Sequence, residues 1–134
     1  MKLRKKLMLG LASAIIIGSI SQVAYAATIS YSLPLPFSGT KDTASTVKQT
    51  NDRDAYNYAD YIGWSGSTII CWIAAQQDSK QISQDSSYSG TGTVYMYYQS
   101  PYQDWYEGHD VKMRAKVSTT TLHACNISGR FNPS

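Results

Sequence analysis

Four side chains between residues 104 and 110 form the densest group of potential metal ligands and acid–base groups in the chain: Asp104, Glu107, His109 and Asp110. Carboxylate oxygens and an imidazole nitrogen could together hold a divalent cation or act as an acid–base pair. Their spacing matches no metal-binding signature, and closely spaced carboxylates do not define a glycosidase pair, which needs a set separation in space. We therefore interpret this segment as a solvated loop, and we predict no metal, no cofactor and no enzymatic activity.

The first 26 residues have the organisation of an export signal. A basic start is followed by the apolar run Leu7–Ile20 and by Ala24-Tyr25-Ala26, a small-residue cleavage site. The apolar run is too short to anchor a protein stably in a bilayer. We predict that residues 1–26 are removed and that residues 27–134 form one secreted, extracellular domain without a membrane span, released or loosely held at the cell surface.

Removal of the signal changes the charge of the protein. The whole chain has 12 basic and 9 acidic residues, a net charge of +3, and four of the basic residues precede Leu7. The secreted part would therefore be slightly acidic. Binding to nucleic acid or to an anionic membrane requires a basic patch on the folded domain, so the composition supports neither of these partners.

The secreted part contains both cysteines, Cys71 and Cys125. Paired cysteines in an oxidising compartment usually form a disulfide, so we predict a Cys71–Cys125 bond. The alternative is a catalytic thiol assisted by His109 or His123. Neither cysteine lies in a local motif typical of a nucleophile, which favours the disulfide.

Composition and periodicity predict an all-β fold. Tyrosine, tryptophan, serine and threonine are abundant after residue 26, whereas leucine is scarce, which favours pleated strands over a helical bundle. We expect an antiparallel β-sandwich of about six to eight short strands with one disulfide. The expected strands cover residues 28–33, 44–50, 55–62, 68–75, 93–99, 110–117 and 122–127, with a further short edge strand between 76 and 92.

The segment 110–117 shows the clearest alternation of apolar and charged residues. Its apolar positions predict a buried face, and the opposite face carries a basic stripe of Lys112, Arg114 and Lys116. Such a stripe is usually the solvated face of a strand or a defence against edge-to-edge aggregation. Contact with an anionic cell-wall polymer is the alternative.

Six aromatic residues lie between residues 95 and 106: Tyr95, Tyr97, Tyr98, Tyr102, Trp105 and Tyr106. Flat rings with polar tips stack on sugars and also anchor protein interfaces. We expect Tyr95 and Tyr97 to share a strand face and to align with the loop that carries Trp105. This surface is a candidate ligand site for a cell-wall glycan or an extracellular protein; the alternative is that half of the rings complete a leucine-poor core.

Two segments in the last part of the chain carry a resemblance. Val111-Lys112-Met113-Arg114-Ala115 and Ser128-Gly129-Arg130-Phe131 resemble the end of a family of small secreted, β-rich proteins of Gram-positive bacteria that has no assigned function. Phe131 stands where tryptophan is more usual in that family, and the two cysteines are not a family feature. The resemblance implies a β-sandwich and no catalytic residues.

These observations lead to two expected functions. The first is a secreted binding or interaction module, without catalysis, that acts at or near the cell envelope. The second is a secreted antibacterial or toxin-like protein made to act on another cell. An inhibitor of extracellular enzymes also remains open, whereas a small hydrolase has little support from the residues.

Overall fold

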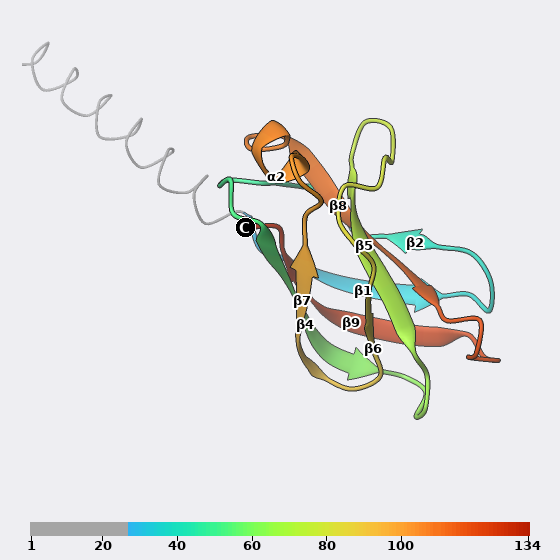
Figure 1. Ribbon diagram of the computed structural model, residues 1–134. Helices are drawn as coiled ribbons and strands as arrows, with labels where there is room; N and C mark the ends of the chain where they lie inside the picture. The colour runs from blue at the N-terminus through green and yellow to red at the C-terminus, as the bar shows by residue number, and fades with distance from the viewer. Residues whose placement is uncertain (1–26) are drawn as a thin grey trace, which may run out of the picture.

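The computed structural model describes residues 27–134, so the predicted signal peptide lies outside the described residues. The described chain forms strands and one short helix (Figure 1). The strands are β1 (Ile29–Leu35), β2 (Lys41–Asp42), β3 (Thr46–Val47), β4 (Asp54–Ile62), β5 (Ile69–Ala75), β6 (Ser86–Tyr88), β7 (Gly92–Tyr97), β8 (Asp110–Val117) and β9 (Cys125–Asn132). The helix α2 (Tyr102–Trp105) is one turn long, and no helix within residues 27–134 is long and apolar enough to span a bilayer.

The strands form two antiparallel sheets. The first has the order β1-β9-β4-β7, and the second has the order β2-β8-β5-β6, with β3 also paired to β8. This confirms the predicted antiparallel all-β class. The described residues contain nine strands, one more than the predicted maximum of eight, because the two-residue strand β2 lies outside every predicted strand.

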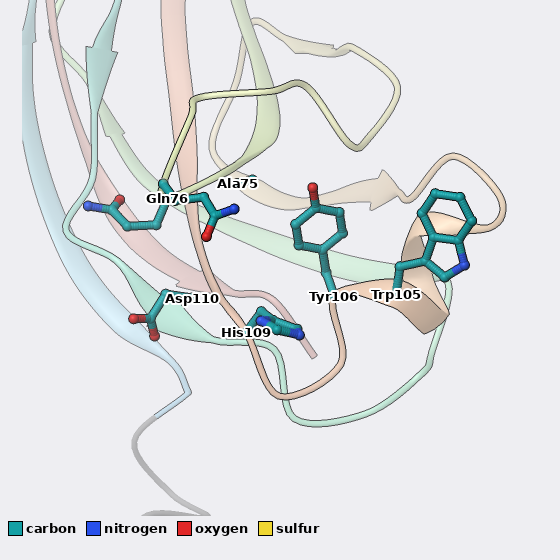
Figure 2. A pocket seen from close by; sticks show the side chains of 7 residues that line it. Ala75, Gln76, Trp105, Tyr106, His109 and Asp110 are labelled. Atoms are coloured by element: carbon teal, nitrogen blue, oxygen red, sulfur yellow. The ribbon is translucent and has the colours of Figure 1, made fainter.

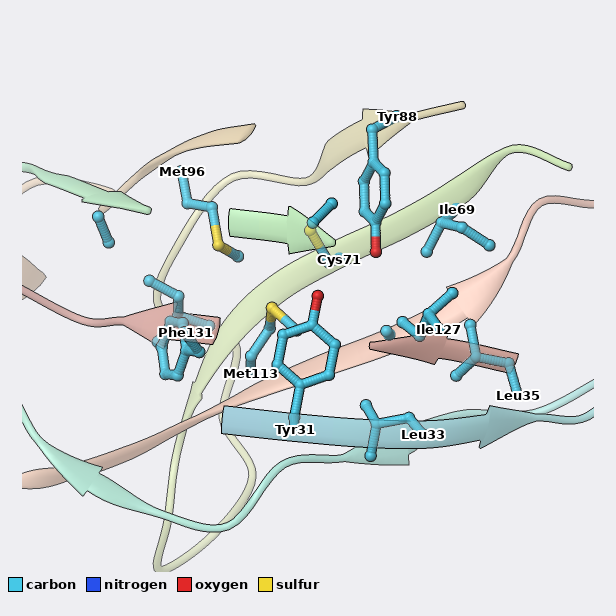
Figure 3. Close-up of a cluster of buried hydrophobic side chains, with 14 of the residues drawn as sticks. Tyr31, Leu33, Leu35, Ile69, Cys71, Tyr88, Met96, Met113, Ile127 and Phe131 are labelled. Atoms are coloured by element: carbon cyan, nitrogen blue, oxygen red, sulfur yellow. The ribbon is translucent and has the colours of Figure 1, made fainter. Parts of the chain in front are cut away.

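The hydrophobic core lies between the two sheets and draws on both of them (Figure 3). Leu33 and Phe131 come from the first sheet, and Ile73 and Met113 come from the second. Along β8 the apolar residues Val111, Met113, Ala115 and Val117 are buried, as the alternation in the sequence predicted, and Lys112 on the opposite face is buried as well. Burial of one face of each sheet is what sets the register of the strands.

Strand ends differ from the prediction in three places. The expected strand 44–50 is reduced to Thr46–Val47, whose neighbour Lys48 is fully buried. The last strand begins at Cys125 instead of residue 122 and continues to Asn132 instead of ending at residue 127, so Leu122 and His123 lie in an exposed loop. Strand β1 continues through Pro34, which is tolerated because β1 is at the edge of its sheet.

The predicted disulfide is wrong: Cys71 and Cys125 are free thiols, and both are buried. Cys71 lies on β5 in the second sheet, where its Sγ atom accepts a hydrogen bond from Asn57 at 3.8 Å. Cys125 is the first residue of β9 in the first sheet, and its Sγ atom donates to the carbonyl of Asn126 at 3.7 Å. The two cysteines therefore lie in opposite sheets and their sulfur atoms have separate hydrogen-bond partners, whereas a disulfide would need the sulfur atoms about 2 Å apart.

Candidate functional site

The predicted aromatic surface divides into two separate groups. Tyr95 and Tyr97 point outward from β7 and are exposed, while Met96 and Tyr98 are buried, as predicted. Trp105 and Tyr106 belong instead to the α2 region, where both rings contact Tyr102. Among the described residues, no ring contact joins the two groups. The expectation that Trp105 aligns with Tyr95 and Tyr97 is therefore not met.

The first group extends onto the neighbouring strand and forms a tyrosine face, made of Tyr56, Tyr58, Tyr95 and Tyr97. The register places Tyr56 opposite Tyr95, and their rings meet edge to face with centroids 5.7 Å apart. The rings of Tyr56 and Tyr58 stack with centroids 6.0 Å apart. The outer surface of the first sheet thus presents a row of rings whose mutual contacts favour one arrangement.

Charged side chains border the tyrosine face. The Arg130 guanidinium lies 5.0 Å from the centre of the Tyr58 ring, in a cation–π arrangement. Arg130 also approaches the Asp60 carboxylate at 3.5 Å. Both partners of this ion pair are about half exposed, so the pair orients the arginine and contributes little to stability.

The second group lines a cavity of about 400 Å³ at one end of the sandwich, which we call the end cavity. Its walls are Ala75, Gln76, Gln77, Trp105, Tyr106, His109 and Asp110. Figure 2 shows Gln76 and Asp110 on one side and the rings of Tyr106 and Trp105 on the other, with His109 between them. Aromatic rings with a few convergent polar groups are the usual composition of a ligand pocket.

Backbone hydrogen bonds hold the two walls of the end cavity. The amide of Gln76 donates to the carbonyl of Asp110 at 3.1 Å, which joins the end of β5 to the start of β8. The amide of His109 donates to the carbonyl of Tyr106 at 3.0 Å, which closes the turn after α2. The polar and the aromatic walls therefore belong to one connected framework.

A buried lysine, Lys48, connects the loop after α2 to residues behind the end cavity. Lys48 exchanges backbone hydrogen bonds with the α2 loop, accepting from Gly108 at 2.6 Å and donating to His109 at 3.0 Å. Its Nζ atom donates to the carbonyl of Asp52 at 2.9 Å and lies 4.4 Å from the centre of the Tyr98 ring. Burial lowers the pKa of Lys48, and Asp52 and Glu107 partly oppose that effect.

The predicted basic stripe is not a free cationic surface. Lys112 is buried and pairs with Asp42 at 3.0 Å, and Arg114 pairs with the same carboxylate at 2.7 Å. Lys116 is half buried, and its ammonium lies 5.7 Å from the centre of the Trp72 ring. Because two of its three charges share Asp42, the stripe serves mainly to fasten β2 to β8.

The acidic and histidine residues of the 104–110 loop do not form a compact ligand set. Within residues 27–134, no three His, Cys, Asp or Glu side chains gather closely enough to hold a metal ion. His109 and Asp110 line the end cavity, whereas Asp104 and Glu107 do not. His123 stacks on Trp64 with ring centroids 4.2 Å apart. The structure brings neither histidine to a thiol: the sulfur partners are Asn57 and Asn126.

Several site residues escaped the sequence analysis. Tyr56 and Tyr58 were assigned to a strand, but their meeting with Tyr95 depends on strand register, which the local sequence does not reveal. Gln76 and Gln77 directly follow the predicted strand 68–75, in a polar segment for which the sequence predicts no site residue. Their position immediately after the most apolar strand, where the chain reaches the end of the sheet, is a signal that could have identified them.

In comparisons with known proteins, no protein-family model and no curated protein matches the sequence.

Proposed function

We propose that residues 27–134 form a secreted, non-catalytic module that binds a glycan of the cell envelope in the end cavity. The observation that carries the proposal is the composition of that cavity, whose lining combines the rings of Trp105 and Tyr106 with the side chains of Gln76, Gln77, His109 and Asp110. Trp105 is 64% exposed although it is one of the largest apolar side chains in the protein. An exposed tryptophan in a pocket that also contains polar side chains is typical of a binding surface.

The chemistry of the end cavity suits a sugar ring. The apolar C–H face of a pyranose can stack on the indole of Trp105 or the phenol of Tyr106. Sugar hydroxyls need both donors and acceptors, which the glutamine amides, His109 and the Asp110 carboxylate supply. The cavity volume of about 400 Å³ is in the range used for small ligands.

The same composition supports binding without hydrolysis. Glycoside hydrolysis usually requires two carboxyl groups on opposite sides of the scissile bond. Asp110 is the one carboxylate among the seven lining residues, so the proposed role uses it as a hydrogen-bond acceptor. Secretion by the predicted signal peptide, and kinship with the small Gram-positive proteins that the sequence resembles, belong to the same proposal.

Pelleting with isolated cell walls tests the proposal. We expect the purified 27–134 protein to sediment with walls, and Trp105→Ala to sediment less. Tyr97→Ala is the matched control, because it removes an exposed ring from the tyrosine face and leaves the end cavity intact. Loss of binding in the Tyr97 variant alone would place the ligand on the tyrosine face, and no pelleting of the wild type would reject envelope binding.

A second function, antibacterial action on other cells, is favoured by a different observation. Phe37, Trp64 and Leu122 expose large apolar side chains on loops. Exposed apolar groups of this kind mark contact with another molecule or a membrane. Growth inhibition of neighbouring bacteria by the purified protein would support this function, and unaffected growth across a panel of species would reject it.

A further inference from the structure

The loops at the end of the sandwich opposite α2 carry exposed apolar side chains. These are the β1–β2 loop (36–40), the β4–β5 loop (63–68) and the β8–β9 loop (118–124) (Figure 1). Phe37, Trp64 and Leu122 are 58%, 49% and 71% exposed, one on each loop. We call this group the apolar tip. Exposure of three large apolar residues at neighbouring loops is costly in water unless they contact something else.

Two of the loops are fastened to each other. The Thr68 amide donates to the Thr121 hydroxyl at 3.0 Å, and the Ser118 amide donates to the Thr68 carbonyl at 2.8 Å. The Trp64 ring stacks on His123 with centroids 4.2 Å apart and planes 28° apart. The positions of Trp64 and Leu122 are therefore linked before any partner binds.

The third loop adjoins the same group. Phe37 lines a cavity of about 340 Å³ together with Lys116 and Thr121. Thr121 also lines a second cavity with Trp64 and Leu122. The shared residue makes the three loops one continuous surface, in which hydroxyl groups separate the apolar side chains.

Some backbone amides of the loops 63–68 and 118–124 are hydrogen-bonded within the protein. The Ser67 amide donates to the Trp64 carbonyl at 3.2 Å, and the Thr121 amide donates to the Ser118 carbonyl at 2.9 Å. The Gly63 amide donates to the Asn126 carbonyl at 2.8 Å. Internally bonded amides lower the cost of moving a loop into an environment poor in water.

Although residues 27–134 as a whole are slightly acidic, the loops of the apolar tip carry no acidic side chain. The loops 36–40, 63–68 and 118–124 contain no aspartate or glutamate, whereas Lys41 follows the first loop and Lys116 lines the Phe37 cavity. The Asp42 carboxylate is already bound to Lys112 and Arg114. Asp60, on β4, pairs with Arg130 at 3.5 Å. The remaining carboxylates also lie outside the tip loops: Asp52, Asp54, Asp78, Asp85, Asp104, Glu107 and Asp110.

From these observations we propose that the apolar tip docks onto the surface of an anionic lipid bilayer. Tryptophan favours the interface between headgroups and acyl chains, Phe37 and Leu122 can enter the outer acyl region, and Lys41 and Lys116 complement the lipid phosphates. The three side chains project from loop tips around hydroxyl groups instead of forming a flat apolar face, which suits a fluid lipid surface better than a rigid protein partner. The proposal is independent of glycan binding, because it uses the opposite end of the molecule.

Sedimentation with lipid vesicles tests this docking. The 27–134 protein is mixed with vesicles of phosphatidylcholine, or of phosphatidylcholine with about one third phosphatidylglycerol as the anionic lipid. We expect pelleting with the anionic vesicles and about tenfold weaker binding for Leu122→Ser or Phe37→Ser. Tyr97→Ser removes an exposed ring far from the tip and should bind as the wild type does. Absence of pelleting of the wild type with either vesicle would overturn the proposal.

A single-tryptophan measurement identifies the part of the protein that meets the lipid. One variant, Trp72→Phe with Trp105→Phe, keeps Trp64; the other, Trp64→Phe with Trp72→Phe, keeps Trp105. Brominated lipids should quench Trp64 emission and leave Trp105 unquenched. Equal quenching, or quenching of Trp105 alone, would overturn docking by the tip. Binding to whole cells that tip variants lose, without vesicle binding, would also overturn it and would indicate a protein partner.

Discussion

The phenol of Tyr31 crosses over Gly129 and donates a 2.6 Å hydrogen bond to the side-chain oxygen of Asn57. Tyr31 lies on β1 and Asn57 on β4, with β9 between them in the sheet. Gly129 is the β9 residue paired with Tyr31. The missing side chain at residue 129 therefore opens the path by which the tyrosine reaches across the central strand.

Gly129→Ala should destabilise the fold by about 2–4 kcal/mol, as overpacking of a core does. A Cβ atom at residue 129 would overlap the Tyr58 carbonyl and lie 2.8 Å from the Tyr31 hydroxyl oxygen. Urea denaturation measures the change. Gly90→Ala is the matched control: a Cβ there meets no atom within 4 Å, so its stability should stay within about 0.5 kcal/mol of the wild type. Equal stability of both variants would refute the role of Gly129.

Tyr31 and Tyr88 point toward one another in the core (Figure 3). The loss of stability on removing the hydroxyl group should differ between these two tyrosines. Tyr31→Phe leaves the Asn57 oxygen without its donor and should cost about 1–3 kcal/mol. The Tyr88 hydroxyl is buried without a well-formed hydrogen bond within the described residues, so Tyr88→Phe should be nearly neutral. Urea denaturation of both variants measures the difference in unfolding free energy. A larger loss of stability for Tyr88→Phe than for Tyr31→Phe would contradict this account.

Stability should fall in alkaline solution. Burial raises the pKa of Tyr88 from 10.0 to about 12 and that of Cys71 from 9.0 to about 12, and it also raises the pKa values of Tyr31 and Tyr98. As the pH rises, the unfolded chain therefore loses these protons before the folded protein does. The contribution of these groups to the free energy of unfolding is complete below about pH 9 and declines as the pH rises towards 12. Between its unfolded and its folded pKa, each such group lowers the free energy of unfolding by up to about 1.4 kcal/mol per pH unit.

Lys48 opposes this trend, because its lowered pKa makes the folded state release a proton before the unfolded state does. The contribution of Lys48 to stability rises with pH up to the ordinary lysine pKa of 10.5. We expect the three tyrosines and Cys71 together to outweigh this single group. Denaturation between pH 7 and pH 11 measures the slope, and Tyr88→Phe should make it shallower. A stability that is constant over that range would contradict the buried, protonated state of these groups.

Reducing agent should leave the melting temperature unchanged, since Cys71 and Cys125 are free thiols. Native protein should also resist thiol-specific reagents, because the nucleophile is the thiolate and burial disfavours it at Cys71. Reaction of both thiols should appear only after unfolding in urea. A lower melting temperature in reducing agent would show a disulfide in the purified protein and reverse this assignment.

The fold was predictable where one face of a strand is buried. In β8 the alternation from Val111 to Val117 reports directly on the core, and it identified the strand and its inner face. The cysteines were not predictable in the same way, because the compartment indicates whether a bond is possible and geometry decides whether it forms. Leu122 misled the placement of β9, since an apolar residue in an exposed loop resembles the start of a strand.

The candidate site was predictable only in part. Alternation correctly placed Tyr95 and Tyr97 on an outer face. Their pairing with Tyr56 depends on the register of two strands that are distant in sequence. The chain also turns after β7, so α2 carries Trp105 to the end of the sandwich and away from those tyrosines. Local patterns identify such residues and their faces, but tertiary topology decides which of them meet.

The most direct test of the central claim, glycan binding in the end cavity, is the fluorescence of Trp105 during titration with soluble cell-wall glycan fragments. The protein carries Trp64→Phe and Trp72→Phe, so that Trp105 is the remaining tryptophan. We predict a saturable change in emission that Gln76→Ala with Asp110→Ala weakens and Tyr97→Ala does not alter. An emission that stays constant while the same protein pellets with walls would contradict the claim, because the glycan would then bind elsewhere.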